Sequence, residues 1–194
     1  MRKSMIKLTI AMSCMAIVLF SCSNLSDHSS DVPKVDSMLV KLDSSIAMMK
    51  NLLLEPLDSY QDTVLAKTAY IQENFRGTMN DVQAEAISKY RYTVSSFPQA
   101  SEHLMDALSQ CLTSKNQINE LKNVIVNKAT KDALGNEITD MYISEALKQE
   151  TIDCEASLQS AKVYSELYLR AIKNYNDTKT FVDSLVQQIP PRKQ

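Results

Sequence analysis

Glycine is nearly absent from this chain. Only Gly77 and Gly135 occur among its 194 residues, and tryptophan does not occur at all. Tight hairpins depend on glycine because it adopts positive φ without a steric penalty, so a sheet protein of this length would need many more. Phosphate-binding glycine loops and the Gly-x-Ser-x-Gly turn of serine hydrolases are excluded on the same ground.

Metal-ligating and catalytic residues are also scarce or dispersed. The chain has two histidines, His28 and His103, and no His-x-x-His or Cys-x-x-Cys spacing. A zinc site needs three or four convergent ligands, so both histidines are interpreted as solvated surface residues. The carboxylates are spread along the chain, and none forms a distinct acid–base pair. We therefore expect no metal, no cofactor and no enzymatic activity.

Charge of one sign does not dominate. The 21 basic and 23 acidic residues are interspersed, and the net charge is −2. Because no basic block is present to follow a phosphate backbone, nucleic-acid binding is not expected. The abundant residues are Leu, Ala, Lys, Glu, Gln and Met, all good helix formers, so the composition predicts an all-α protein.

The first 22 residues have the pattern of an export signal. Three basic residues lie within the first seven positions, and the 13 residues 8–20 are then apolar apart from Thr9 and Ser13. A run of this length is typical of a signal-peptide core and is too short for a comfortable membrane span. No later apolar run reaches the length of about 20 residues that a spanning helix needs.

The end of this run, Leu19-Phe20-Ser21-Cys22, resembles the lipobox of bacterial lipoproteins. An aliphatic residue stands three positions before the cysteine and a small residue directly before it, although Phe20 replaces a more usual small residue. The resemblance covers about a tenth of the chain. It implies that residues 1–21 are removed and that the Cys22 thiol carries a diacylglycerol group, which anchors the protein in a membrane. An ordinary secretory signal with an incidental Cys22, or a retained anchor, is the alternative.

The resemblance also implies a location in the bacterial cell envelope. Ser23 follows the cysteine where an aspartate would resemble an inner-membrane retention signal, so the outer membrane is favoured. Removal of residues 1–21 would leave 18 basic and 23 acidic residues and change the net charge to about −5. Residues 22–33 are then the lipidated cysteine and a flexible tether, because residues 23–33 are polar and serine-rich without an apolar period.

Residues 34–194 show the apolar spacing of packed helices. Intervals of three and four residues form a heptad seam early in this region, and strict intervals of seven follow later. The early seam is Val35, Leu39, Leu42, Ile46, Met49 and Leu53, and the later one is Leu147, Cys154, Ala161, Tyr168, Tyr175, Val182 and Ile189. The pattern predicts an elongated, coiled-coil-like antiparallel bundle.

The two glycines divide this bundle into three predicted helices, 34–76, 79–131 and 139–189, with Gly77 as the C-cap of the first. Pro56 and Pro98 lie 21 residues on either side of Gly77. In antiparallel neighbours these positions share a height, so we expect a bend or break in both helices at one level. If both prolines end their helices, the body becomes four or five shorter rods.

Cys111 and Cys154 lie on apolar stripes of the second and third predicted helices. Pairing across a turn centred near residue 133 places them at similar heights, and an extracytoplasmic compartment permits a disulfide between them. Two small buried thiols that fill core positions explain the same pattern, and both interpretations stay open.

Tyrosine, with eight residues, is the one enrichment. Tyr164, Tyr168 and Tyr175 fall near one stripe of the last predicted helix, and Tyr142 precedes them. These side chains could complete the edges of the core, or they could form an exposed strip that binds a partner.

These features together predict a lipid-anchored, non-enzymatic scaffold or interaction protein. We expect a protein partner at the far tip near Gly77 and along the tyrosine-bearing face, with self-association as a further option. Two other classes are considered. One is a small-ligand-binding or sensory bundle with a pocket at the level of Pro56 and Pro98. The other is a membrane-acting pore-former or exclusion factor, whose best inserting segment is residues 46–57.

Overall fold

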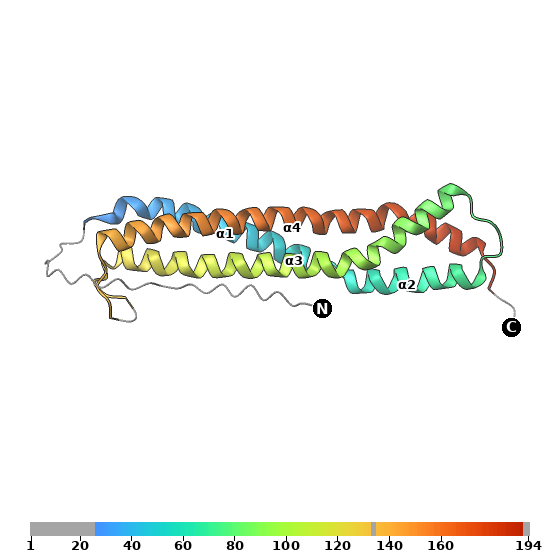
Figure 1. Ribbon diagram of the computed structural model, residues 1–194, viewed down its shortest axis with the longest axis horizontal. Helices are drawn as coiled ribbons and strands as arrows, with labels where there is room; N and C mark the ends of the chain where they lie inside the picture. Colours follow the sequence, from blue (N-terminus) through green and yellow to red (C-terminus); the bar gives the residue numbers. More distant parts are fainter. Residues whose placement is uncertain (1–25, 133–134, 192–194) are drawn as a thin grey trace, which may run out of the picture.

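A computed structural model describes residues 26–132 and 135–191. The predicted signal peptide and Cys22 lie outside these residues. The described elements are a short 3-10 helix and four α-helices: η1 (His28–Asp31), α1 (Val32–Leu52), α2 (Leu57–Asn74), α3 (Asp81–Val126) and α4 (Asp140–Gln188). They form an elongated helical bundle (Figure 1), so the prediction of an all-α fold is confirmed.

The bundle consists of three rods. Helices α3 and α4 run antiparallel along most of its length, and α1 followed by α2 forms the third rod against both of them (Figure 1). The seven residues spaced at intervals of seven in the last predicted helix are all buried. The heptad interpretation of that helix is therefore confirmed.

The two prolines lie at one level but act differently. Pro56 caps α2 after a short turn, so the first rod is broken into α1 and α2. Pro98 lies inside α3, which continues through it. The ring centroids of Tyr60, one turn beyond the break, and Phe97 are 6.3 Å apart, so the two sites share a height.

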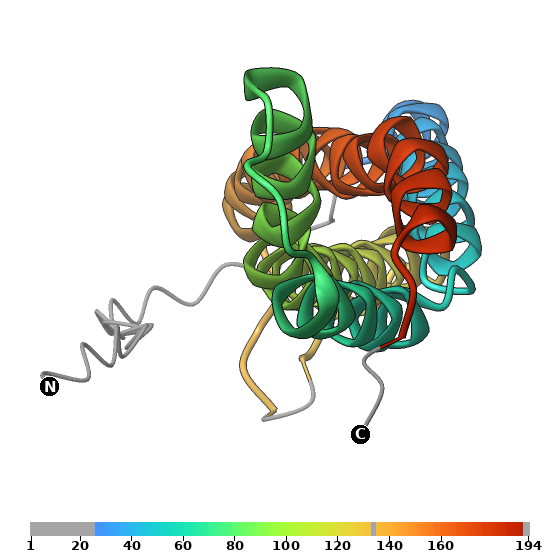
Figure 2. The same ribbon diagram turned by 90° about the vertical axis from the view of Figure 1, so that its right-hand side faces the viewer.

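The N-terminal part of α3 turns away from the axis of the bundle. Figure 1 shows this part (green) leaving the line of α4, and Figure 2 shows it projecting beyond the other helices. A proline inside a helix lacks a backbone donor and crowds the preceding turn, which bends the helix without ending it. The bend leaves one face of α3 without a partner helix.

The helix ends follow local side-chain chemistry. Asn80 caps α3 in a capping box with Gln83, and Thr139 caps α4 by accepting from the backbone N–H of Tyr142 at 3.1 Å. Gly135 has a φ of 86°, as expected for a glycine turn. The predicted cap at Gly77 is wrong, because α2 ends at Asn74 and the next residue is already extended.

Candidate functional site

The segment nearest to Cys22 is folded against the start of α4. Ser26 donates to both carboxylate oxygens of Asp140, from its backbone N at 2.9 Å and from Oγ at 2.6 Å. The prediction of a flexible tether over residues 22–33 is therefore wrong from Ser26 onward, because this part of the segment is folded. Sequence reasoning missed this contact because it relied on apolar periodicity, whereas the segment is held by hydrogen bonds to a residue 114 positions away.

His28 lies between two carboxylates at this end of the bundle. Its Nδ1 is 3.0 Å from Asp31 Oδ2, and its Nε2 is 3.3 Å from Asp140 Oδ1. The hydrogen bond to Asp31, assisted by Asp140, raises the pKa of His28 above its usual value. The two Ser26 hydrogen bonds, with a smaller contribution from His28, lower the pKa of Asp140. Only residues 23–25 separate Cys22 from this folded segment.

The tyrosines of α4 do not form an exposed strip. Tyr168 and Tyr175 are only 1% and 2% exposed. Tyr164 is half-buried and stacks on His103 with ring centroids 4.9 Å apart. Tyr142 is more exposed but lies in the first turn of α4, at the opposite end from the Gly77 tip. The core interpretation is confirmed for Tyr168 and Tyr175, and the prediction of a partner face there is wrong.

Aromatic rings fill the level of the proline break. Tyr175 stacks on Tyr60 with centroids 4.6 Å apart and on Tyr90 at 5.8 Å, while Phe97 meets it edge-on at 5.9 Å. Tyr90, Phe97 and Tyr175 are all buried. This packing argues against the ligand pocket that a sensory bundle would need at the level of Pro56 and Pro98.

The two cysteines of the body are buried free thiols in this structure. Cys111 Sγ donates to the backbone oxygen of Ser157 at 3.5 Å, and Ser157 lies one turn beyond Cys154 on α4. A turn centred near residue 133 would place Cys111 opposite Cys154. The contact with Ser157 shows that α3 and α4 are shifted by about one helical turn from that register. Burial raises the pKa of Cys111 to about 11, which keeps this thiol protonated at neutral pH.

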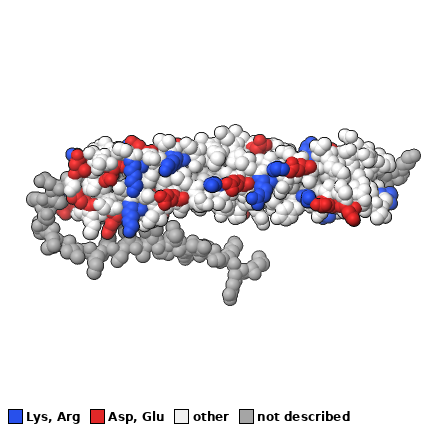
Figure 3. Space-filling view, turned by 90° about the horizontal axis from the view of Figure 1, so that it is seen from above, with Lys and Arg blue, Asp and Glu red and all other residues white. Residues whose placement is uncertain are grey.

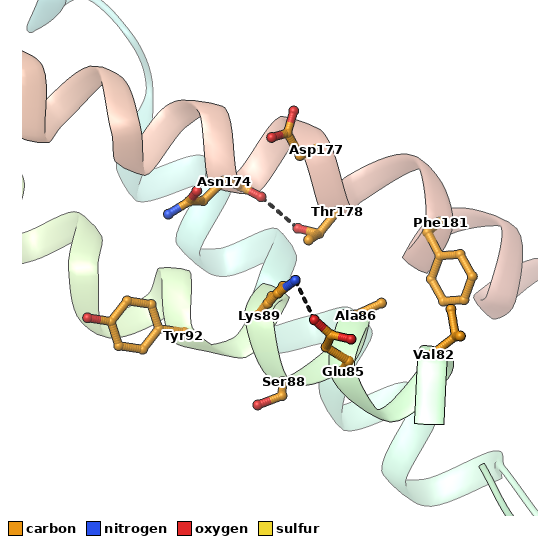
Figure 4. Close-up of a pocket in the computed structure, with 10 residues that line it drawn as sticks. All are labelled: Val82, Glu85, Ala86, Ser88, Lys89, Tyr92, Asn174, Asp177, Thr178 and Phe181. Atoms are coloured by element: carbon orange, nitrogen blue, oxygen red, sulfur yellow. Dashed lines mark hydrogen bonds and ion pairs between the residues drawn. The ribbon is translucent and has the colours of Figure 1, made fainter. Parts of the chain in front are cut away.

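An open groove lies at the end of the bundle opposite to Ser26. It runs between the bent part of α3 and the last third of α4 and has a volume of about 710 Å³. Figure 4 shows the lining side chains on the two helices, with Phe181 of α4 pointing toward Val82 of α3. The lining residues are Val82, Glu85, Ala86, Ser88, Lys89 and Tyr92 from α3, and Asn174, Asp177, Thr178 and Phe181 from α4.

The chemistry of this groove suits recognition. Val82 and Tyr92 are 67% and 66% exposed, so the groove presents two large apolar side chains of α3 to solvent. Between them Glu85 and Lys89 form an ion pair at 2.6 Å, and this contact lowers the pKa of Glu85. Sequence reasoning placed a partner site at this tip but missed these residues, because a helical stripe does not reveal where α3 bends.

The rest of the described surface offers little else. In the view of Figure 3, acidic and basic side chains are interspersed without a block of one sign. Within residues 26–132 and 135–191, no group of histidine, cysteine or acidic residues converges to hold a metal ion, and no helix is both long and apolar enough to cross a membrane. Comparison with known proteins returned no matching family model, curated protein or solved structure.

Proposed function

We propose that this protein is a lipoprotein of the bacterial cell envelope that acts as a non-enzymatic helical scaffold. The lipobox-like sequence supports anchoring through a diacylglycerol group on Cys22. Ser23 favours the outer membrane over the inner one. The helical body would then hold an interaction site at a distance from the membrane.

One observation carries this proposal: the groove lies at the opposite end of α4 from the segment that leads to Cys22. Ser26 is bonded to Asp140 at the start of α4, and Phe181 of the groove lies 41 residues further along the same helix. At 1.5 Å per residue this separation is roughly 60 Å. A chain anchored near Asp140 therefore presents the groove well clear of the lipid headgroups.

The groove is the part of the scaffold that we expect to bind a partner. Exchange of both large apolar side chains, Val82→Ser with Tyr92→Ser, removes the surface that a partner would bury, and each such side chain contributes about 1.5–3 kcal/mol when fully buried. Cross-linking in the native envelope followed by mass spectrometry should show that at least one cross-linked species is lost.

A matched control uses exposed apolar residues outside the groove. Met105→Ser with Ile152→Ser removes side chains that are similarly exposed on the same two helices. This control variant should keep the cross-links of the unchanged protein. If the groove variant kept every cross-linked species as well, the interaction site would not be in the groove.

A further inference from the structure

The groove face of α3 has a symmetry that runs along the helix. Its six lining residues form three pairs at equal distances on either side of Ile87. The pairs are Val82 with Tyr92, Glu85 with Lys89, and Ala86 with Ser88. Each pair joins residue types that fit together: an aliphatic with an aromatic side chain, an acid with a base, and two small side chains. Ile87 points into the core, so the pairs Val82 with Tyr92 and Glu85 with Lys89 lie on the opposite face, while Ala86 and Ser88 flank it.

We propose that the groove receives a second copy of this chain, with residues 82–92 of the two α3 helices packed antiparallel about a two-fold axis at the level of Ile87. A two-fold interface uses the same patch on both subunits, so the patch must complement itself when reversed. The face of α3 meets this requirement, because reversal brings the two members of each pair to the same height. The inference rests on the proposed function, since it names the partner that the same groove would bind.

The exposed apolar side chains give this contact a driving force. In Figure 4, Tyr92 lies at one end of the groove, and Val82 lies with Phe181 at the other. An antiparallel second helix places its own Val82 near Tyr92 and its own Tyr92 near Val82, so both ends are covered at once. Ala86 and Ser88 are short and lie on the two flanks of this face, so they leave room for a second helix there.

Charge selects the antiparallel direction. Side chains of Glu85 and Lys89 are 66% and 63% exposed, so both remain available to a second chain. In the antiparallel pair, Glu85 of each copy lies at the height of Lys89 of the other copy. A parallel pair in register would instead place glutamate beside glutamate and lysine beside lysine, which repel each other.

Charge inversion in trans tests this arrangement. Glu85→Lys gives a chain with two lysines at these positions, and Lys89→Glu gives one with two glutamates. Sedimentation of the lipidated full chain in detergent should show a dimer for the unchanged protein. Each variant alone should dissociate, with a dissociation constant raised by about tenfold or more, since like charges now face each other twice. An equimolar mixture of the two variants should form a dimer containing one copy of each.

Recovery of the dimer in the mixture would distinguish a contact between two chains from an effect of the substitutions within one chain. Both variants lose the intrahelical Glu85–Lys89 pair, and mixing does not restore it. Circular dichroism should give the same helix content for both variants. If the mixture stayed monomeric, or if each variant dimerised as tightly as the unchanged protein, the inference would be overturned.

Cross-linking through single cysteines keeps the inference testable even if a charge variant fails to fold. Ser88→Cys, next to the axis, should give a cross-linked dimer with a short bismaleimide. Ser109→Cys, an exposed position 21 residues further along α3, should not. A monomeric chain whose groove substitutions still remove a different envelope protein would overturn the second-copy inference and leave the proposed function standing. If the groove substitutions changed no cross-link, both would fail.

Discussion

At the scale of single residues, the placement of His28 makes the end of the bundle that holds residues 26–31 sensitive to pH. The pKa of His28 is raised, so its stabilising contribution is complete below about pH 6.5 and is lost as pH rises through the higher folded-state pKa. The pKa of Asp140 is lowered from about 3.8, so its contribution is complete above that pH and is lost below it. The contacts between residues 26–31 and α4 are therefore strongest between about pH 4 and 6.5.

We expect proton NMR titration of His28 to give a pKa above 6.5, because Asp31 and Asp140 both stabilise the imidazolium. Amide-exchange protection of residues 28–31, corrected for the intrinsic rate, should fall as pH rises through that value. Asp140→Asn should move the pKa of His28 down and weaken the pH dependence. A pKa at or below 6.5 in the unchanged chain would contradict the observed contacts.

Hydrogen bonds of single side chains can be predicted from the sequence where donor and acceptor are close along the chain. The caps at Asn80 and Thr139 depend on local sequence alone, because their hydrogen bonds reach only three residues ahead. His28 was interpreted as a solvated histidine, which is wrong for an imidazole held between two carboxylates. Its partner Asp140 lies 112 residues away, and no local spacing marks such a contact.

At the scale of helices, the long α3–α4 pair includes a polar contact inside an apolar seam. Ser114 Oγ and Ser157 Oγ are 2.8 Å apart, and both residues are buried. Each hydroxyl has the other as its hydrogen-bond partner in the buried interface between α3 and α4. This contact joins α3 to α4 at the observed register of the two helices.

Ser114→Ala should lower the free energy of unfolding by about 1–3 kcal/mol, because the hydroxyl of Ser157 is left buried without its partner. Ser157→Ala should act similarly. The loss of unfolding free energy in the double variant should be smaller than the sum of the losses in the two single variants, since no unpaired hydroxyl remains. Urea denaturation followed by circular dichroism measures all four proteins. Strict additivity would mean that the two hydroxyls do not interact.

The register of helices was less predictable than their existence. The stripes at intervals of seven predict α4 correctly, because burial follows the period of the helix. The same reasoning placed Cys111 and Cys154 at equal height, but the turn between α3 and α4 is offset from its assumed centre near residue 133. Likewise, the shared level of Pro56 and Pro98 could be predicted, whereas a break at one and a bend at the other could not. That difference depends on tertiary packing around each proline.

At the scale of the whole molecule, a two-fold contact at the tip sets the distance between two anchors. Val126, the last residue of α3 near the anchor end, lies 39 residues from Ile87. Two rods joined antiparallel at Ile87 would therefore hold the Val126 ends of their α3 helices at most about 120 Å apart, because α3 bends at Pro98 between these residues. Such a pair would connect two membrane patches.

The elongated shape could be predicted from the scarcity of glycine and the long stripes, whereas the groove could not. Its existence depends on the direction in which α3 turns at Pro98, and a single sequence does not specify that direction. The tip near Gly77 was nevertheless the expected partner site, because a rod anchored at one end exposes the other. The groove residues lie beside this tip, while the predicted tyrosine face belongs to the core.

The proposed scaffold function depends most on the lipid anchor at Cys22, and membrane fractionation of cells that express the chain tests this anchor most directly. Cys22→Ala removes the thiol that would carry lipid and should move the protein from the membrane pellet to the soluble fraction. Cys14→Ala, in the segment predicted to be removed, should leave it in the pellet. If the Cys22→Ala protein stayed in the membrane to the same extent, the anchor and the scaffold function proposed for it would be contradicted.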